Sequence, residues 1–304
     1  SYYFVWIMMA ILGMGTLPIV WTYVISNWFD KSRGLALGLT LMGTGIAATL
    51  APRYAAWLIE KYGWQVAYQG LAATALLIGL PVLTLLLKDR PKSKLLIDST
   101  VQYKSGVTLG TAVKDYRFWV LGLSILGIAL GVSGVISNLA SLLVDKGYTL
   151  AEAGSLAGLI GISVIIGRIV TGLLFDRFWA PLVACIILIL PAISCITLAG
   201  DFGPLGLAIA VFIVGLAAGA ELDMLAFMSS RYFGLSSYGR IYALQYIFFA
   251  VGAGIAPTLF GWMRDSSGSY SSILNVSAVL FVICSMLLLT MGRYPTFKQP
   301  SPQG

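Results

Sequence analysis

Long apolar blocks recur along the chain, and short polar or charged stretches separate them. An apolar run of about 20 residues is the length that a helix needs to cross the hydrocarbon core of a bilayer. The pattern predicts nine membrane-spanning helices, at residues 2–28, 34–59, 65–87, 117–144, 150–175, 179–199, 204–229, 237–263 and 271–292. Residues 89–116 are long and polar enough to link two bundles, and residues 294–304 form a short tail.

Two parts of the chain resemble each other at a separation of 205 residues. The matched pairs, in order, are Gly34 with Gly239, Pro52 with Pro257, Trp57 with Trp262, Glu60 with Asp265 and Gly63 with Gly268. Such a repeat indicates two parallel copies of a six-helix unit. Residues 117–293 hold a complete copy, the C-terminal bundle, whereas residues 1–88 match only its last three helices. We therefore expect an N-terminally truncated twelve-helix protein whose first three helices are missing.

The composition agrees with a membrane protein. Hydrophobic residues make up 59% of the chain and charged residues 10%, with a mean hydropathy of +0.91, whereas soluble domains carry about 25% charged residues. The fold class is therefore an all-α polytopic membrane protein. Histidine is absent, and Cys185, Cys195 and Cys284 lie inside apolar blocks. This argues against a metal site, a haem, histidine-based catalysis and a disulfide framework, so we expect no cofactor and no enzymatic activity.

The basic residues are distributed unevenly along the chain. If the predicted spans alternate in direction, 14 of the 19 Lys and Arg residues fall on one side and three on the other, and Arg53 and Arg168 lie within spans. The positive-inside rule then places the linker and the C-terminus in the cytoplasm. Orientation in a bilayer explains the net charge of +7 more simply than nucleic-acid binding, which we do not expect.

One motif suggests a family. The segment GRIVTGLLFDR (167–177) ends a predicted helix and enters a short cytoplasmic loop. It resembles the second-half copy of the loop signature of the major facilitator superfamily, G-x-x-x-D-R, through Gly172, Asp176 and Arg177. After Arg177, the Gly-Arg-Arg/Lys of the signature is replaced by Phe178, Trp179 and Ala180, so only its first half is present. The resemblance implies the major facilitator fold, with two pseudo-symmetric six-helix bundles and a substrate site between them near the bilayer midplane.

Two further segments resemble one branch of that superfamily, the monocarboxylate porters and oxalate/formate exchangers. They are NWFDKSRGLALG (27–38) and SRYFGLSSYGRIYA (230–243). The branch implies a small organic anion, a carboxylate, as the substrate, and it places a substrate-binding arginine in the eighth span. Residues 150–175 would be that span, and Arg168 is the matching residue.

Arg168 is the first candidate for substrate binding. It lies eight residues before Asp176, which places it about 12 Å into the membrane at the helical rise of 1.5 Å per residue. A guanidinium stays protonated and can grip a carboxylate through two parallel hydrogen bonds. The alternative is a structural ion pair with Glu221 or Asp223.

Glu221 and Asp223 are candidates for ion pairing or for carrying a coupling proton. Charged residues within a membrane span are costly and need a partner or a cavity. The two carboxylates are separated by about 200° around a helix, so they cannot both face one cavity. We expect one of them to make a structural contact, and both alternatives stay open for each residue.

Weaker candidates for lining the substrate path are Asn138, Tyr242 and Gln245, which are polar residues within predicted spans. Intramembrane Asn and Gln residues also bond neighbouring helices, so each has a structural alternative. For Arg53, near the outer end of its span, we expect the side chain to snorkel toward the interface.

Asp176, Arg177 and Arg33 are assigned to a cytoplasmic gate. Asp176 ends a helix, where the helix dipole disfavours a negative charge, so it should have a compensating partner. The resemblance implies that this partner is the N-terminal turn of residues 34–59, around Ser32 to Gly34.

These observations predict a secondary active transporter of a small organic anion that works by alternating access, with a proton as the candidate coupling ion. We expect a monomer in the bacterial inner (plasma) membrane, whose partners are the lipid bilayer and a small-molecule substrate. The alternatives are a non-transporting membrane sensor with the same fold and an inactive fragment of a transporter. An enzyme is disfavoured because no nucleophile-base, metal or paired-carboxylate arrangement lies near a membrane face.

Overall fold

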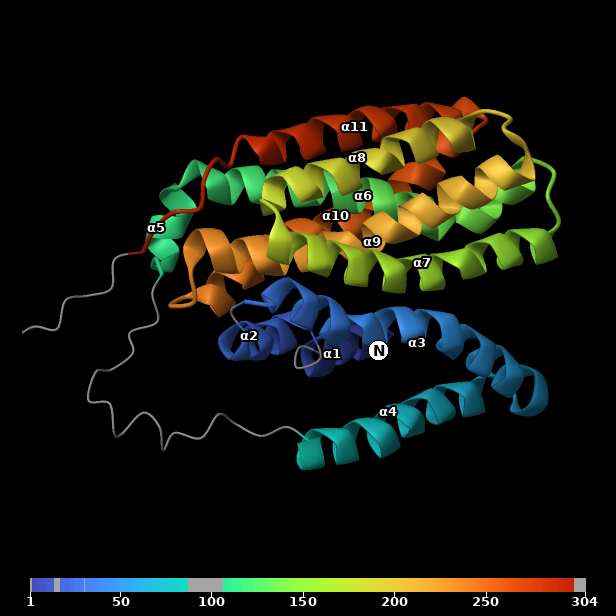
Figure 1. The fold of residues 1–304 in the computed structure, drawn as a ribbon. Helices are drawn as coiled ribbons and strands as arrows, with labels where there is room; N and C mark the ends of the chain where they lie inside the picture. The colour runs from blue at the N-terminus through green and yellow to red at the C-terminus, as the bar shows by residue number, and fades with distance from the viewer. Residues whose placement is uncertain (1, 14–16, 30, 87–105, 298–304) are drawn as a thin grey trace, which may run out of the picture.

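The structure is a computed structural model that describes residues 2–13, 17–29, 31–86 and 106–297 (Figure 1). Within these residues the regular elements are helices. They are α1 (Tyr2–Leu12), α2 (Pro18–Trp28), α3 (Arg33–Tyr62), α4 (Trp64–Leu86), α5 (Leu109–Lys114), α6 (Tyr116–Asp145), α7 (Leu150–Arg177), α8 (Ala180–Ala199), α9 (Gly203–Phe233), α10 (Tyr238–Ser267) and α11 (Ser271–Leu289).

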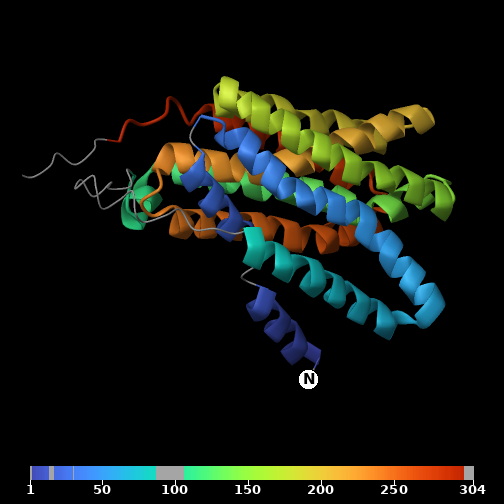
Figure 2. The ribbon, with the colours of Figure 1, turned by 60° about the horizontal axis from the view of Figure 1, so that its bottom comes forward.

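The predicted number of spans is not confirmed. Seven helices in the described part of the chain are long and apolar enough to cross a membrane. The predicted helix over residues 2–28 is wrong, because that segment forms two 11-residue helices, α1 and α2. Pro18 begins α2, and proline favours the first turn of a helix because it has no backbone N–H to bond the preceding turn. Figure 2 shows α1 projecting away from the other helices.

The helices form two groups, which we call the N-terminal group (α2–α4) and the C-terminal group (α6–α11). In Figure 1 the C-terminal group forms the upper layer and the N-terminal group lies below it. Most of the buried apolar side chains belong to the C-terminal group, where Phe227, Phe260 and Phe281 are among the largest that are fully buried. Many large apolar side chains, such as Leu77 and Ile186, are exposed, as expected for surfaces that face lipid.

The bundle has two ends, which we call the linker end and the far end. The linker end holds α5, the start of α3 and the end of α7, and the far end holds the start of α7 and the end of α10. Of the predicted linker, residues 89–105 lie outside the described residues. Its end, in contrast, contains α5 and is fixed to the C-terminal group, because Val107 N donates to Phe233 O at 2.9 Å and Ser236 Oγ donates to Val107 O at 3.0 Å.

Helices α3 and α10 correspond at both ends at the separation found in the sequence. Both contain 30 residues, and α10 starts and ends 205 residues after α3. Each helix is followed by a glycine with positive φ, Gly63 at 86° and Gly268 at 77°, a conformation that glycine adopts without steric cost. These bounds agree with a repeat, and the division into a partial and a complete bundle stays a prediction.

The two groups meet most closely where α3 lies along α7 and α9. Small residues allow this approach. A Cβ added to Gly34 would meet the carbonyl oxygen of Gly172, and one added to Gly38 would lie 2.5 Å from the carbonyl oxygen of Arg168. Backbone atoms of the two helices are therefore in direct contact from the linker end to the level of Arg168, as small residues permit between membrane helices.

Candidate functional site

Arg168 lies inside the protein at the contact between the two groups. Its side chain is 3% exposed, and its Nη1 atom is 2.6 Å from Oδ1 of Asp223, whose side chain is 1% exposed. The Arg168 Nη2 atom donates a hydrogen bond of 3.1 Å to Thr44 Oγ1 on α3. Of the two interpretations from the sequence, the ion pair is therefore present in this state, and the Arg168 side chain is enclosed within the protein.

Glu221 adds a second carboxylate beside this pair. It is 5% exposed, and it lies close enough to Arg168 for the guanidinium charge to act on it. Its Oε2 atom has no hydrogen-bond partner among the described residues. We call Arg168, Asp223 and Glu221 the central charged cluster, which combines one positive charge with two carboxylates.

Glu221 and Asp223 point in different directions around α9, yet both carboxylates interact electrostatically with Arg168. Both side chains are within range of Arg168, although only Asp223 bonds to it directly. One of the two thus makes the expected structural contact, and it is Asp223. The sequence could not choose between them, because either residue was close enough along α9 to meet α7.

Several polar atoms around this cluster are buried and unpartnered. Arg168 Nε, Asp223 Oδ2, Glu221 Oε2 and the Tyr242 hydroxyl have no hydrogen-bond partner within the described part of the chain. Buried polar groups are nearly always hydrogen-bonded, so a concentration of unpartnered ones calls for a functional explanation. These unpartnered donors and acceptors make the central charged cluster the candidate site for a polar ligand.

Tyr242 belongs to a row of tyrosines that leads from the linker end toward the central charged cluster. Tyr23 of α2 stacks on Tyr238 with ring centroids 6.2 Å apart, Tyr238 stacks on Tyr242 at 5.6 Å, and Tyr242 stacks on Tyr246 at 6.3 Å. Asp223 and Arg168 act electrostatically on the Tyr242 hydroxyl. The predicted path residue Tyr242 is thus near Arg168, but it is 0% exposed in this state.

The other two predicted path residues make contacts within the C-terminal group. Gln245 is fully buried, and its Nε2 donates to Phe118 O at 2.8 Å. Asn138 donates from Nδ2 to Gly134 O at 3.0 Å and accepts a long hydrogen bond of 3.4 Å from the Tyr270 hydroxyl. Both residues therefore make structural contacts between or within helices in this state, and neither donates to or accepts from Arg168 in the described structure.

The contact expected for Asp176 is confirmed. Its Oδ1 accepts a hydrogen bond of 2.7 Å from Gly34 N, and its Oδ2 accepts one of 2.9 Å from Leu35 N. Both amides belong to the first turn of α3, whose N–H groups have no partner within the helix and carry partial positive charge. The end of α7 is thereby joined to the start of α3 at the linker end.

The two arginines assigned to the gate lie in different environments. Arg33 is 6% exposed, with its Nε donating to Phe29 O at 3.1 Å and its Nη1 donating to Ser230 Oγ on α9 at 3.2 Å. Arg33 therefore adds a second link between the groups at the linker end. Arg177, in contrast, is exposed on the surface. The Arg53 side chain lies outside the described residues, so its expected snorkelling stays a prediction.

Three contributors were missed at the level of sequence: Thr44, Ser230 and the tyrosine row. Threonine and serine are frequent in membrane helices, where they bond their own backbone, and so carry no signal by themselves. The tyrosines at 238, 242 and 246 do carry one, since a spacing of four residues places side chains on one helix face. That spacing alone would have predicted a common aromatic face on α10.

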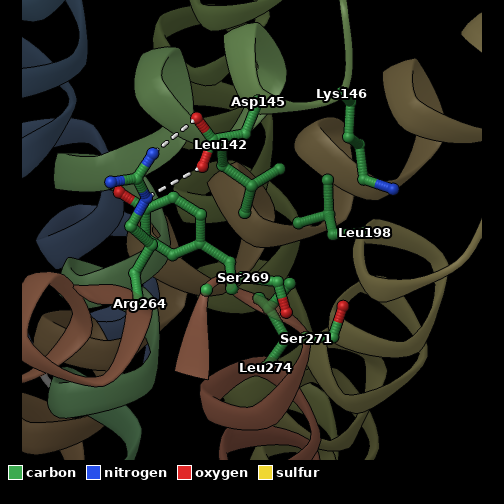
Figure 3. A pocket seen from close by; sticks show the side chains of 10 residues that line it. Leu142, Asp145, Lys146, Leu198, Arg264, Ser269, Ser271 and Leu274 are labelled. Atoms are coloured by element: carbon green, nitrogen blue, oxygen red, sulfur yellow. Dashed lines mark hydrogen bonds and ion pairs between the residues drawn. The ribbon is translucent and has the colours of Figure 1, made fainter. Parts of the chain in front are cut away.

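A cavity of about 350 Å³ opens at the far end, away from the central charged cluster (Figure 3). It lies between the ends of α6 and α10, the loop before α11 and the start of that helix. Its charges are already paired, because Arg264 Nε and Nη2 each lie 3.0 Å from an oxygen of Asp145, and Lys146 Nζ lies 3.5 Å from Asp201 Oδ1. We read this region as a junction of helix ends and not as the substrate site.

Comparison with known proteins identifies the family. The profile of the Major Facilitator Superfamily matches residues 1–257. Monocarboxylate transporter 13 from Bos taurus is 28% identical over 284 residues, which cover 91% of this chain and 64% of that protein. An uncharacterized 38 kDa protein in the 23S RNA operon of Thermoproteus tenax is 30% identical over 282 residues, covering 91% of this chain and 67% of that protein. The chain thus spans somewhat less than two thirds of the length of the bovine protein.

Solved structures agree on the fold. The fucose:proton symporter of E. coli superposes with a TM-score of 0.69 at 15% sequence identity, over 92% of this chain and 74% of the symporter. At this identity the likeness concerns the fold alone. Together with the profile match over most of the sequence and the long apolar helices of the described part, it leads to one conclusion. The chain is a multi-pass membrane protein that belongs to the Major Facilitator Superfamily.

Proposed function

We propose that this chain forms part of a secondary active transporter that moves a small organic anion, with monocarboxylates as the substrate class, by alternating access. The observation that carries the proposal is the position of Arg168, which is buried at the contact of the two helix groups and already holds a carboxylate, that of Asp223. A substrate carboxylate would bind the same guanidinium beside Asp223. The names of relatives such as Monocarboxylate transporter 13 support the same substrate class.

The charge and the planar set of N–H donors of a guanidinium group make a buried arginine suited to anion binding. Guanidinium remains charged in a membrane protein and offers several N–H donors in one plane. Arg168 uses Nη1 and Nη2 in this state, while Nε has no partner among the described residues. A bound anion would satisfy that donor, and the unpartnered Tyr242 hydroxyl is a second candidate donor to the same ligand.

We place the coupling proton on Glu221. Asp223 accepts a short hydrogen bond from Arg168, and this contact is strongest when the carboxylate is ionised. Glu221 Oε2 has no hydrogen-bond partner in the described part of the chain, and a second negative charge beside one arginine is costly in a low-dielectric interior. Protonation of Glu221 removes that charge and leaves Arg168 and Asp223 as a neutral pair.

We place the linker end in the cytoplasm, following the distribution of basic residues. The contacts of Asp176 with Gly34 and of Arg33 with Ser230 then close the cytoplasmic side. With this orientation, the cytoplasmic gate is closed in the present state. Arg177 is exposed and lies next to the gate residue Asp176. Residence in a bacterial inner membrane and a monomeric state remain part of the proposal.

The proposal is tested by uptake into proteoliposomes that contain the purified protein, with radiolabelled lactate and pyruvate as monocarboxylates and oxalate as the dicarboxylate comparison. We expect monocarboxylate uptake that is lost in Arg168→Ala and strongly reduced in Arg168→Lys, which keeps the charge but loses the planar fork. Arg264→Ala is the matched control, because it removes another arginine that is paired with an aspartate but lies at the far end. Normal uptake in Arg168→Ala would overturn the proposed site.

The coupling assignment has its own measurement. An inwardly directed proton gradient should stimulate uptake by the unaltered protein. In Glu221→Gln the stimulation should disappear while exchange of labelled for unlabelled anion continues, because exchange does not require the proton to leave. If Glu221→Gln responds to the gradient as the unaltered protein does, the proton is carried elsewhere.

A further inference from the structure

We propose that Thr44 is a positioning residue for Arg168, which holds the guanidinium against α3 while the linker end is closed and releases it when an anion binds. Thr44 belongs to the N-terminal group, whereas Arg168 and Asp223 belong to the C-terminal group. The inference deepens the proposed function, on which its kinetic part rests.

The contact is a direct bond between the two groups at the level of the central charged cluster. Arg168 Nη2 donates to Thr44 Oγ1 at 3.1 Å, and the Thr44 hydroxyl donates in turn to Leu41 O on its own helix at 2.8 Å. The single hydroxyl proton is used by Leu41, so the oxygen is left as an acceptor for Arg168. The geometry therefore fixes Thr44 as acceptor and Arg168 as donor.

The surroundings tie this bond to the closed state. Gly38, about a turn and a half before Thr44 on α3, has its Cα so close to α7 that an added Cβ would be 2.5 Å from Arg168 O and 3.5 Å from Asp223 Oδ2. Helix α3 thus lies against both members of the ion pair, with the bare backbone at Gly38 and with the hydroxyl at Thr44. Any movement of α3 away from α7 breaks the Thr44 bond.

The two residues joined by this hydrogen bond differ in their exposure. Thr44 is exposed, whereas Arg168 is 3% exposed. Nη2 is consequently the guanidinium nitrogen that borders an accessible residue, and Nη1 is enclosed with Asp223. An anion that approaches past Thr44 meets Nη2 first and competes with the threonine oxygen for it. Release of Thr44 then removes one of the bonds that hold α3 on α7.

The test compares Thr44→Val, which keeps the shape and removes the acceptor, with Thr44→Ser, which keeps the acceptor. Thr40→Val is the matched control, because Thr40 lies one turn earlier on α3, is exposed, and bonds only Ala36 O of its own helix at 2.8 Å among its described hydrogen bonds. All variants are made in a background in which Cys185, Cys195 and Cys284 are replaced by alanine.

Opening is measured without substrate from the alkylation rate of a cysteine at position 37, introduced as Leu37→Cys. Leu37 is 0% exposed and belongs to the core that α3 shares with the C-terminal group, so its alkylation requires opening. We expect Thr44→Val to raise the rate roughly tenfold, the effect of losing one hydrogen bond to a charged group. Thr44→Ser and Thr40→Val should leave it within about twofold, because neither loses that bond.

Transport gives the second readout. In Thr44→Val the KM for the anion and the turnover number should fall together, because the anion no longer competes with Thr44 while the closed state is less populated. A purely structural defect would lower turnover without lowering KM. If Thr44→Val does not elute as a monodisperse protein, Thr44→Ala replaces it in both measurements.

An unchanged alkylation rate in Thr44→Val, or a serine variant that behaves like the valine variant, would overturn the inference. A KM that rises would overturn the claim that the anion takes over Nη2. If instead the alkylation rates follow the expected pattern and no anion is transported by the unaltered protein, the positioning contact stands and the proposed function fails.

Discussion

The carboxylate of Asp176 accepts a hydrogen bond of 2.7 Å from the backbone amide of Gly34, across the contact between the last turn of α7 and the first turn of α3. A second bond, from Leu35 N, occupies its other oxygen. An acidic group at the C-terminal end of its own helix is unfavourable, and the same group at the N-terminal end of another helix is favourable. The position of Asp176 is therefore stabilising only while α3 and α7 are together.

Asp176→Asn should weaken closure of the linker end. The amide keeps one acceptor oxygen but loses the charge and the second acceptor, which we expect to cost about 1–2 kcal/mol in the closed state. Spin labels on Lys31→Cys and Phe178→Cys, which replace exposed residues on the two sides of the contact, report the separation by pulsed electron paramagnetic resonance. The distribution should shift toward longer distances. Asp201→Asn, at a fully exposed aspartate, is the control and should leave it unchanged.

Gly34→Ala should destabilise the protein, because the added Cβ would meet the carbonyl oxygen of Gly172 and the backbones would have to separate. Gly43→Ala on the same helix has no atom within 4 Å of the added Cβ and should be neutral or stabilising by up to about 1 kcal/mol, the gain in helix propensity. A thiol-reactive dye can follow thermal unfolding, since the three cysteines are buried. Equal melting temperatures for the two variants would contradict the close contact at Gly34.

Substitutions in the central charged cluster should be unequal in their effect on stability. Arg168→Leu leaves two buried carboxylates without a cation and should cost about 3–5 kcal/mol. Asp223→Leu should cost less, since Glu221 remains within range of the arginine. Thermal unfolding of the two single variants and of the double variant in detergent checks the order. The double variant should be more stable than Arg168→Leu and inactive in uptake. An equal loss of stability in both single variants would contradict the role of Glu221 as a replacement partner for Arg168.

The ion pair at the far end should matter much less. Arg264 contacts Asp145 through two nitrogens, but their side chains are 42% and 33% exposed, and exposed pairs contribute about 0–1 kcal/mol. Arg264→Ala should therefore lower the melting temperature by a few degrees at most, and the loss should shrink further in high salt. A loss as large as that of Arg168→Leu would mean that the junction in Figure 3 is a major determinant of stability.

The sequence predicted most of the long helices closely because each is a largely apolar block with glycine, proline or charge at its ends. Helices α8 and α11, for example, begin within one residue of the expected positions. It failed at residues 2–28, where Pro18 lies inside an apolar block and hydropathy does not register the break. The repeat at 205 residues was visible because glycine, proline and tryptophan carry positional constraints that apolar residues do not.

The site was predicted in part, and charge explains which part. Arg168, Asp223 and Asp176 stand out because an ionised group in a membrane helix or at its end requires a partner, and each has one here. Which carboxylate bonds Arg168 depends on the rotation of α9 relative to α7, which the sequence does not contain. Thr44 was missed for a related reason, since a hydroxyl in a helix can always bond its own backbone and gives no sign of an external partner.

The matched bounds of α3 and α10 bear on the ancestry of the molecule. If the two helices descend from one duplicated segment, position 44 of the first copy corresponds to position 249 of the second, and the residues there are Thr44 and Phe249. Divergence after duplication would then have given one copy a hydrogen-bond acceptor for Arg168 and the other an aromatic ring against Tyr246. The two copies would no longer be interchangeable, and exchanging these side chains between them would measure how far they have specialised.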